Sequence, residues 1–158
     1  MVDLIIRRAV AADASRLNQA LRALSNDLDD THLASDDDIE AAGFGESPCF
    51  SALLAESQNA VVGVAMYSPF FSTTRGVPGV FVSDLWVCAT ARGSGIARRL
   101  LAKVCTTSSQ QWHAAFLRLN VYRHNQAAIA AYTKLGFEVE LHETVMTLGA
   151  EPFEHLRG

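Results

Sequence analysis

Two spacings of apolar residues run through this chain and predict a mixture of helices and strands. Apolar positions three or four residues apart predict helices, whose ends are marked by capping residues and glycines. The expected helices begin after Asp13, after Ser35 or Asp36, after the glycines at 93 and 95, and after Asn125, and they end near Asn26, at Gly43, by about Gln111 and at Gly136.

Runs rich in β-branched and aromatic residues predict strands. The expected strands cover residues 4–8, 50–55, 61–67, 80–87, 116–121, 137–141 and 144–148. The last two are expected to form a closing hairpin, and residues 68–79, which hold two prolines and two glycines, a loop. The order of the tail over residues 151–158 stays open. The order of elements predicts a mixed α/β sheet with helices on both faces, in a single domain spanning residues 1–158.

Length and composition narrow the class of protein to which this chain can belong. The chain has 158 residues, of which 49% are hydrophobic and 19% charged, as in an ordinary globular domain. No apolar run approaches the roughly 20 residues of a membrane helix, and the N-terminus lacks the pattern of a secretory signal, so the cytoplasm is expected. The 3 cysteines are widely spaced without a CxxC, so we expect reduced core residues, with no disulfide framework and no metal site.

The charge is unevenly distributed. The net charge is −4, yet the stretch from Asp27 to Glu40 holds seven acidic residues and no lysine or arginine. Outside it the chain is mildly basic, and its one basic cluster is small: Arg92, Arg98, Arg99 and Lys103. A nucleic-acid partner is therefore not expected, because it would need a basic stripe.

A glycine-rich turn leads from a strand into a helix at Arg92-Gly93-Ser94-Gly95. Backbone amides at a helix N-terminus attract anions, and glycines let a phosphate approach them closely. The turn lacks the Gly-Lys-Ser/Thr of an ATP-binding loop, and Arg98 replaces the small third residue of a dinucleotide fingerprint. Taken alone, the glycines fit a phosphate site and a purely steric need of the turn equally well.

A second pattern follows about thirty residues later: Asn125-x-x-Ala128-x-x-x-Tyr132-x-x-x-Gly136-Phe137. Together with Arg92-x-x-Gly95-x-Ala97, it resembles the GNAT superfamily of acyl-CoA-dependent N-acetyltransferases. The resemblance implies a mixed, mostly antiparallel sheet of about seven strands flanked by about four helices. It also implies acetyl-CoA as co-substrate, with no metal. The residues that it assigns to the coenzyme are Leu85, Trp86, Val87, Arg92, Gly93, Ser94, Gly95, Ile96, Ala97, Arg98, Asn125, Ala128 and Tyr132.

The likeness extends to one family within that superfamily. Residues 43–48, 63–67 and 83–87 are similar to stretches of the spermidine/spermine acetyltransferases and their diamine and thialysine relatives, and Ile6-Arg7-x-Ala9-x-x-x-Asp13 also fits. The likeness covers the chain up to about residue 141. It implies a small-molecule amine as acceptor and a homodimer as the assembly.

Acetyl transfer to an amine needs a base and an acid. Tyr132 is the expected acid, because a phenol can hand a proton to the departing thiolate. The related enzymes carry a glutamate where this chain has Ser83, so the base stays open between Asp84 and solvent, with His124 as a weaker candidate.

The acidic stretch suggests how a cation is chosen. Asp27, Asp29 and Asp30, with Ser83, are the expected substrate-binding residues, although a charged run is equally often a solvated face. The predicted function is N-acetylation of a polyamine, a diamine or a thialysine-like amino acid. Another amine acceptor (an aminoglycoside, a different amino acid or a protein amine) and a non-catalytic acyl-CoA-binding module are the alternatives.

Overall fold

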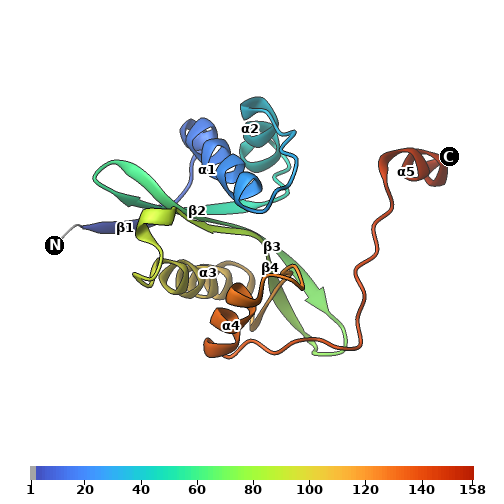
Figure 1. Ribbon diagram of the computed structural model, residues 1–158. Coiled ribbons are helices and arrows are strands. Elements are labelled where there is room, and N and C mark those ends of the chain that lie inside the picture. The colour runs from blue at the N-terminus through green and yellow to red at the C-terminus, as the bar shows by residue number, and fades with distance from the viewer. Residues whose placement is uncertain (1–2) are drawn as a thin grey trace. The chain divides into compact units, whose positions relative to one another are not determined.

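The computed structural model describes residues 3–158, which form helices and one mixed sheet (Figure 1). Its strands are β1 (Leu4–Arg8), β2 (Ser51–Ser57), β3 (Ala60–Ser72), β4 (Val77–Val87) and β5 (Phe116–Leu119). Its α-helices are α1 (Ala14–Asp27), α2 (Asp36–Phe44), α3 (Ile96–Trp112), α4 (Gln126–Lys134) and α5 (Ala150–Arg157), and its 3₁₀ turns are η1 (Ala11–Asp13) and η2 (Ala89–Ala91).

The strands of the described residues form one five-stranded sheet in the order β1-β2-β3-β4-β5. Neighbouring strands from β1 to β4 are antiparallel, and β5 pairs parallel with β4. The predicted class, a mixed and mostly antiparallel α/β sheet, is confirmed.

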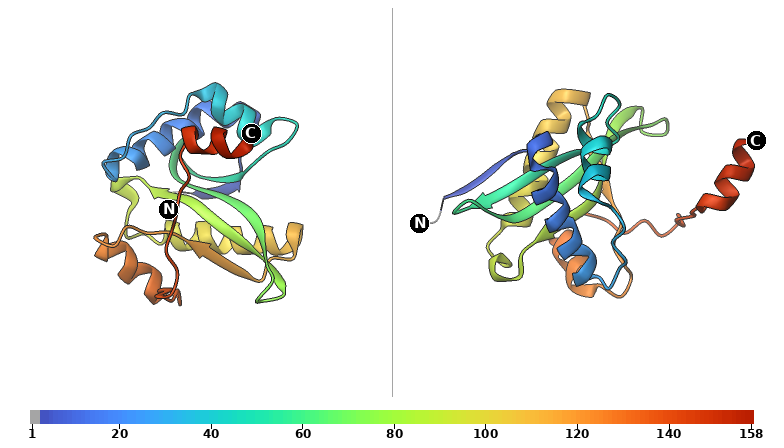
Figure 2. Two further views of the ribbon diagram at one scale, coloured as in Figure 1. Left: turned by 90° about the vertical axis from the view of Figure 1, so that its right-hand side faces the viewer. Right: turned by 90° about the horizontal axis from the view of Figure 1, so that it is seen from above.

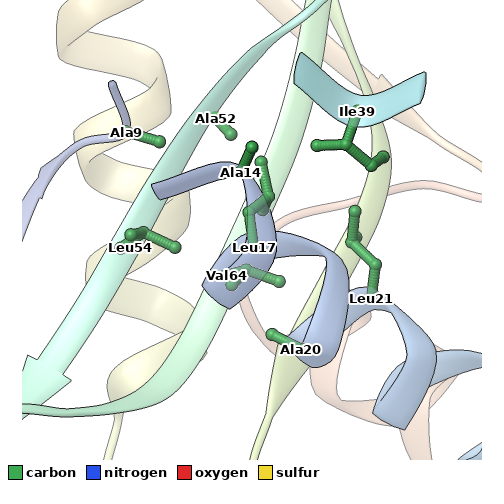
Figure 3. Close-up of a cluster of buried hydrophobic side chains, with 9 residues drawn as sticks. All are labelled: Ala9, Ala14, Leu17, Ala20, Leu21, Ile39, Ala52, Leu54 and Val64. Carbon is green, nitrogen blue, oxygen red and sulfur yellow. The ribbon is translucent and has the colours of Figure 1, made fainter. Parts of the chain in front are cut away.

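Helices α1 and α2 pack on one face of the sheet and α3 on the other (Figure 2). The α1 face is held by buried apolar side chains that meet between helix and strands (Figure 3). Leu17 of α1, Leu54 of β2 and Val64 of β3 are each fully buried there. Ile39 brings α2 into the same cluster, which fixes both helices over the sheet.

Helix α3 lies close to the opposite face because β3 has a glycine beneath it. A Cβ placed on Gly63 would meet Ile96 Cγ2 and Leu100 Cδ1, each at 3.1 Å. Ile96, Leu100 and Val104 are buried along the helix. The N-terminal turn of α3 is therefore anchored in the core by its first residue.

An ion-pair network ties β1, β2 and the start of α1 together. Arg7 makes two hydrogen bonds to Asp13, of 2.7 and 2.8 Å, and its Nε donates to Glu56 at 2.7 Å. Arg16 pairs with Glu56 at 2.7 Å. Asp13 stands at the N-cap of α1, as expected, yet its carboxylate accepts from the Val10 amide and so caps the preceding turn, not α1.

Several expectations about elements are wrong. Residues 68–79 are mostly strand, because β3 and β4 continue to a tight turn over residues 73–76. The closing hairpin is absent from the described residues: residues 137–149 form no strand, so the sheet has five strands where seven were expected. The tail forms α5, which makes five α-helices in the described residues where four were expected. Cys49 and Cys105 are exposed and Cys88 half-buried, all three unpaired, so they are not core residues.

The chain divides into two compact units, one ending at Asn120 and the other beginning at Val121. The first holds the sheet with α1, α2 and α3. The second holds α4, α5 and the segment between them.

Candidate functional site

The turn before α3 has the geometry of an anion site. Gly93 and Gly95 have φ of +78° and +81°, a left-handed conformation that glycine adopts without strain. A Cβ at either position would meet nothing within 4 Å, so the backbone is open on that side. Gly95 is the N-cap of α3 and offers no side-chain hydrogen bond to the first turn.

The first backbone amides of a helix have no partner within it and lie at the positive end of its dipole. Helix α3 has 17 residues, and the backbone bond from Arg99 N–H to Gly95 O (3.1 Å) closes its first turn. The amides of residues 96–98 therefore have no partner within α3, and they lie at its positively polarised N-terminus. The side chains of Arg98 and Arg99 are exposed on the same turn. These groups fit a phosphate or diphosphate, as expected for Gly93, Ser94, Gly95, Ile96, Ala97 and Arg98.

The strand leading to this turn has an open edge. β5 pairs with β4 only from Gly79 to Val82. In the part of the chain that the structure describes, residues 83–87 of β4 therefore have no strand on that edge. Of the three residues expected there, Leu85 and Val87 face this side, because Cys88 and, by alternation, Trp86 bond to β3. The Val87 carbonyl accepts from Arg92 Nε at 3.0 Å, and the other backbone groups on this side can pair with an extended ligand, as an added strand would.

A β-bulge in β4 brings Ser83 and Asp84 together. Met66 of β3 pairs with Asp84, and the next residue, Tyr67, pairs with Val82, so Ser83 is an extra residue in β4. In a regular strand neighbouring side chains point to opposite faces, and the bulge breaks that alternation here. The Ser83 hydroxyl lies 3.3 Å from Met66 O and also forms a hydrogen bond with Asp84.

The Asp84 carboxyl is an unusually basic aspartate. Burial raises its pKa above the ordinary value, while the Ser83 hydrogen bond and the charge of His32 act in the opposite direction. A carboxylate with a raised pKa is a better proton acceptor than a solvated one. Asp84 is therefore the base candidate that the geometry of this unit supports.

His32 is a residue that sequence reasoning missed. It is half-buried in the segment between α1 and α2, and its charge acts on Asp84. The Asn18 amide nitrogen donates to Ala34 O and Asp36 Oδ1, so Asn18 Oδ1 accepts from His32 Nε2 at 2.8 Å. The only sequence signal was a lone histidine within the acidic stretch.

The other ring nitrogen of His32 faces a hydroxyl that can turn. Nδ1 lies 3.0 Å from Ser25 Oγ, and that hydroxyl also lies 3.2 Å from Leu21 O. The Ser25 hydroxyl thus links the His32 ring to the backbone of α1.

The acidic segment does not present three free carboxylates. Asp27 Oδ2 accepts from Arg92 at 2.5 Å and from the Trp86 indole at 3.0 Å. Asp29 and Asp30 are exposed, and Asp29 has a left-handed φ of 56°. Asp27 and Arg92, expected at the amine and the coenzyme respectively, thus contact each other.

In the second unit, α4 begins as the sequence predicts. Asn125 caps it by accepting from the Ala128 amide at 3.2 Å, and Gly136 follows it with φ of +98°. Tyr132 is half-buried, its ring centroid 5.5 Å from that of Phe137. Burial raises the pKa of its phenol, so the hydroxyl stays protonated over a wider pH range. His124 is exposed and stacks on Tyr122.

Residues 3–158 contain neither a metal-binding cluster nor a membrane-spanning helix. No three histidine, cysteine, aspartate or glutamate side chains gather there as a metal ion would require. Within the same residues, none of the helices has the length and hydropathy needed to span a membrane.

Known proteins similar to this chain agree with that geometry. The model of the acetyltransferase (GNAT) family matches residues 17–137. A thialysine N-epsilon-acetyltransferase of Sus scrofa is 30% identical over 146 residues, which is 86% of this chain and 85% of the pig protein. A spermidine/spermine N(1)-acetyltransferase-like protein of Homo sapiens is 33% identical over 145 residues, 83% of this chain and 20% of the human protein.

Solved structures share the fold. An aminoglycoside N-acetyltransferase in complex with CoA superposes with a TM-score of 0.75 at 18% identity, covering 95% of this chain and 96% of its own.

Proposed function

Since the chain belongs to the acetyltransferase (GNAT) family, whose members are N-acetyltransferases that use acetyl-CoA, we propose that it acetylates a primary amine of a small cationic acceptor. The acceptor is a polyamine, a diamine or a thialysine-like basic amino acid, and residues 1–158 act as one catalytic domain. The observation that carries the proposal is the open glycine turn at the N-terminus of α3, next to the unpaired edge of β4.

The coenzyme would be held by two sets of groups in the first unit. The amides from Gly93 to Arg98 bind its diphosphate, because they are polarised and sterically open. Backbone groups of Leu85 and Val87 that face the open edge of β4 bind its extended arm, and Trp86 contributes its side chain to that region. In the second unit, the proposed coenzyme-binding residues are Asn125, Ala128 and Tyr132, which stand in the family's motif.

The amine must lose a proton before it can attack. An alkyl ammonium has a pKa near 10, so at pH 7 the neutral form costs roughly 4 kcal/mol. Asp84 takes that proton first, and Ser83 orients the carboxylate. The neutral nitrogen then bonds to the acetyl carbon, the carbon–sulfur bond breaks, and the Tyr132 phenol gives its proton to the leaving thiolate. The second proton of the nitrogen leaves through solvent, which returns a proton to the phenol.

The acceptor's positive charge is met by the acids that follow α1. Asp27, Asp29 and Asp30 are exposed, and Asp27 is hydrogen-bonded to the Trp86 indole of β4. The names of the two curated relatives agree with a cationic amine acceptor. An aminoglycoside also carries several ammonium groups, and an enzyme acting on one shares this fold.

The deciding experiment is a panel of amines at fixed acetyl-CoA, with release of the free thiol as the readout. The panel contains spermidine, 1,3-diaminopropane, thialysine, lysine and an aminoglycoside. The proposal expects turnover with at least one of the first three. Turnover with the aminoglycoside alone would move the acceptor to that class, and thiol release with none would refute the proposed function.

The assembly and location complete the proposal. We place the enzyme in the cytoplasm, where unpaired cysteines such as Cys49, Cys88 and Cys105 stay reduced. A homodimer would cover apolar side chains that the second unit exposes, among them Leu141 and Met146, which are 82% and 91% exposed.

A further inference from the structure

One ion pair joins the residues proposed for the coenzyme to those proposed for the amine. Arg92 immediately precedes the glycine turn, and Asp27 is the last residue of α1. The Arg92 guanidinium donates to Asp27 Oδ2 at 2.5 Å, and its Nε donates to the Val87 carbonyl at 3.0 Å. The arginine of the turn thus reaches toward the acceptor side.

This contact changes what Asp27 can do for a cation. Its Oδ2 accepts from both Arg92 and the Trp86 indole, so the charge of the carboxylate is largely balanced before any ligand arrives. An ammonium group that approaches Asp27 meets an ion pair in place of a free anion. The affinity of Asp27 for an amine therefore depends on whether the Arg92 guanidinium stays paired with it.

We propose that Arg92 couples the two ligands: a diphosphate bound at the Gly93–Gly95 turn draws the guanidinium away from Asp27, which is thereby released to bind the acceptor's ammonium. Arg92 then acts as a specificity-determining residue for the amine. The inference rests on the proposed function, because it needs the coenzyme at the turn and the amine at Asp27. Coenzyme binding would precede productive amine binding.

The strength of the ion pair suits such a role. The side chains of Arg92 and Asp27 are 53% and 45% exposed, and ion pairs of that exposure are weak. A diphosphate at a helix N-terminus carries more negative charge than one carboxylate, so it competes effectively for the guanidinium. Coupling between two sites is reciprocal, so weakening the ion pair from the Asp27 side must strengthen coenzyme binding.

The test measures binding of free coenzyme A by calorimetry, without any amine. Asp27→Asn should bind coenzyme A about 2- to 5-fold tighter than the wild type at low ionic strength, because Arg92 is already free. Asparagine is well tolerated at a helix C-terminus, so folding should be preserved. Asp37→Asn, an exposed acid of α2, removes the same charge elsewhere and should change the affinity by less than about half as much.

A double mutant separates coupling from general electrostatics. In the Arg92→Gln background, Asp27→Asn should give no gain in coenzyme affinity. A gain in coenzyme affinity that persists in the Arg92→Gln background would overturn the coupling. So would an Asp27→Asn gain no larger than that of Asp37→Asn. In either case, binding of coenzyme A would still support the site at the glycine turn. Failure of the wild type to bind coenzyme A would refute both proposals. Because this experiment contains no amine, its result tests the coupling even if the proposed acceptor class is wrong.

Discussion

Tyr132 carries the most specific prediction at the scale of single residues. Its phenol is half-buried, and burial raises its pKa, which keeps it protonated until a strong base such as a thiolate forms. Tyr132→Phe removes the proton donor and little else. We expect kcat to fall about 100-fold or more, the usual contribution of a general acid, with the coenzyme dissociation constant changed by less than about twofold.

The control for this substitution is Tyr122→Phe, which removes the same hydroxyl from an exposed tyrosine of the same unit. It should leave kcat near the wild-type value. If Tyr132→Phe turns over acetyl-CoA as fast as Tyr122→Phe does, the proton reaches the thiolate from elsewhere and the assignment fails.

The pH dependence of the reaction tests Asp84. The base works when ionised, and burial raises its pKa above the ordinary aspartate value. Activity should therefore fall with acidification at a pH above that of a solvated aspartate. Ser83→Ala removes a hydrogen bond that lowers the pKa of Asp84, so the acid limb of kcat/KM should move to higher pH. Asp84→Asn should abolish that limb and lower kcat/KM about 100-fold.

These two substitutions also discriminate against solvent as the base. A solvent base predicts that Asp84→Asn keeps most of the wild-type rate, and that Ser83→Ala leaves the acid limb where it was. Asp37→Asn, at an exposed position of α2, serves as the matched change of charge.

Residue patterns in the sequence name candidate groups for the chemistry, but they do not show how these groups face one another. Tyr132, Asn125 and the glycines at 93 and 95 stand in a motif whose spacing is visible in the sequence. The partnership of Ser83 with Asp84 depends on a one-residue slip between β3 and β4, which only strand pairing reveals. The charge of His32 acts on Asp84 across the fold, which no local pattern in the sequence encodes.

At the scale of elements, Gly63 fixes how closely α3 approaches the sheet. A Cβ there would lie 3.0 Å from the Trp86 carbonyl oxygen and 3.1 Å from two side-chain atoms of α3. Gly63→Ala should therefore lower the free energy of unfolding by about 1–3 kcal/mol in urea titrations, through overpacking. Gly149→Ala adds the same methyl where nothing lies within 4 Å, and it should change stability far less. Equal stability of the two variants would show that α3 can shift.

The network that joins β1, β2 and α1 predicts a pH-dependent stability. Asp13 is 7% exposed, and its hydrogen bonds to Arg7 lower its pKa to about 2. Because the folded-state pKa lies below the unfolded value, the stabilisation is present above about pH 4 and is lost as pH falls through about 2. Asp13→Asn should cost about 2 kcal/mol near pH 7, and the difference from wild type should shrink toward pH 2. A difference independent of pH would contradict this account.

Element boundaries were misjudged where local signals and pairing disagree. Prolines and glycines over residues 68–79 indicated a loop, yet Pro69 pairs opposite Val80 and Pro78 opposite Phe71 within a long hairpin. Gly79 is needed there, since a Cβ would come within 2.5 Å of the Phe116 ring. A glycine that admits a neighbouring ring and one that makes a turn look the same in a sequence.

At the scale of the whole molecule, the order of helices and strands sufficed to predict the mixed α/β class and the helices on both faces. The strand pattern of residues 137–148, in contrast, did not predict the structure of this segment correctly. Alternating residues give a segment strand propensity, but a strand also needs an edge to pair with. In the described residues this segment pairs with none, so its apolar side chains stay exposed: Val139, Leu141, Val145, Met146 and Leu148.

The exposed apolar side chains of residues 137–148 lead us to predict that the protein is a homodimer in solution. Fully burying an apolar side chain contributes about 1.5–3 kcal/mol, and Leu141, Val145 and Met146 are 82%, 73% and 91% exposed. A second copy supplies an equivalent apolar segment, and symmetric self-association is the commonest way to cover one. Light scattering should give twice the chain's 17.1 kDa. Val145→Glu should shift the protein toward monomer, whereas Thr144→Glu, a charge at the neighbouring polar position, should leave the dimer intact. A wild type that stays monomeric at micromolar concentration would refute the prediction.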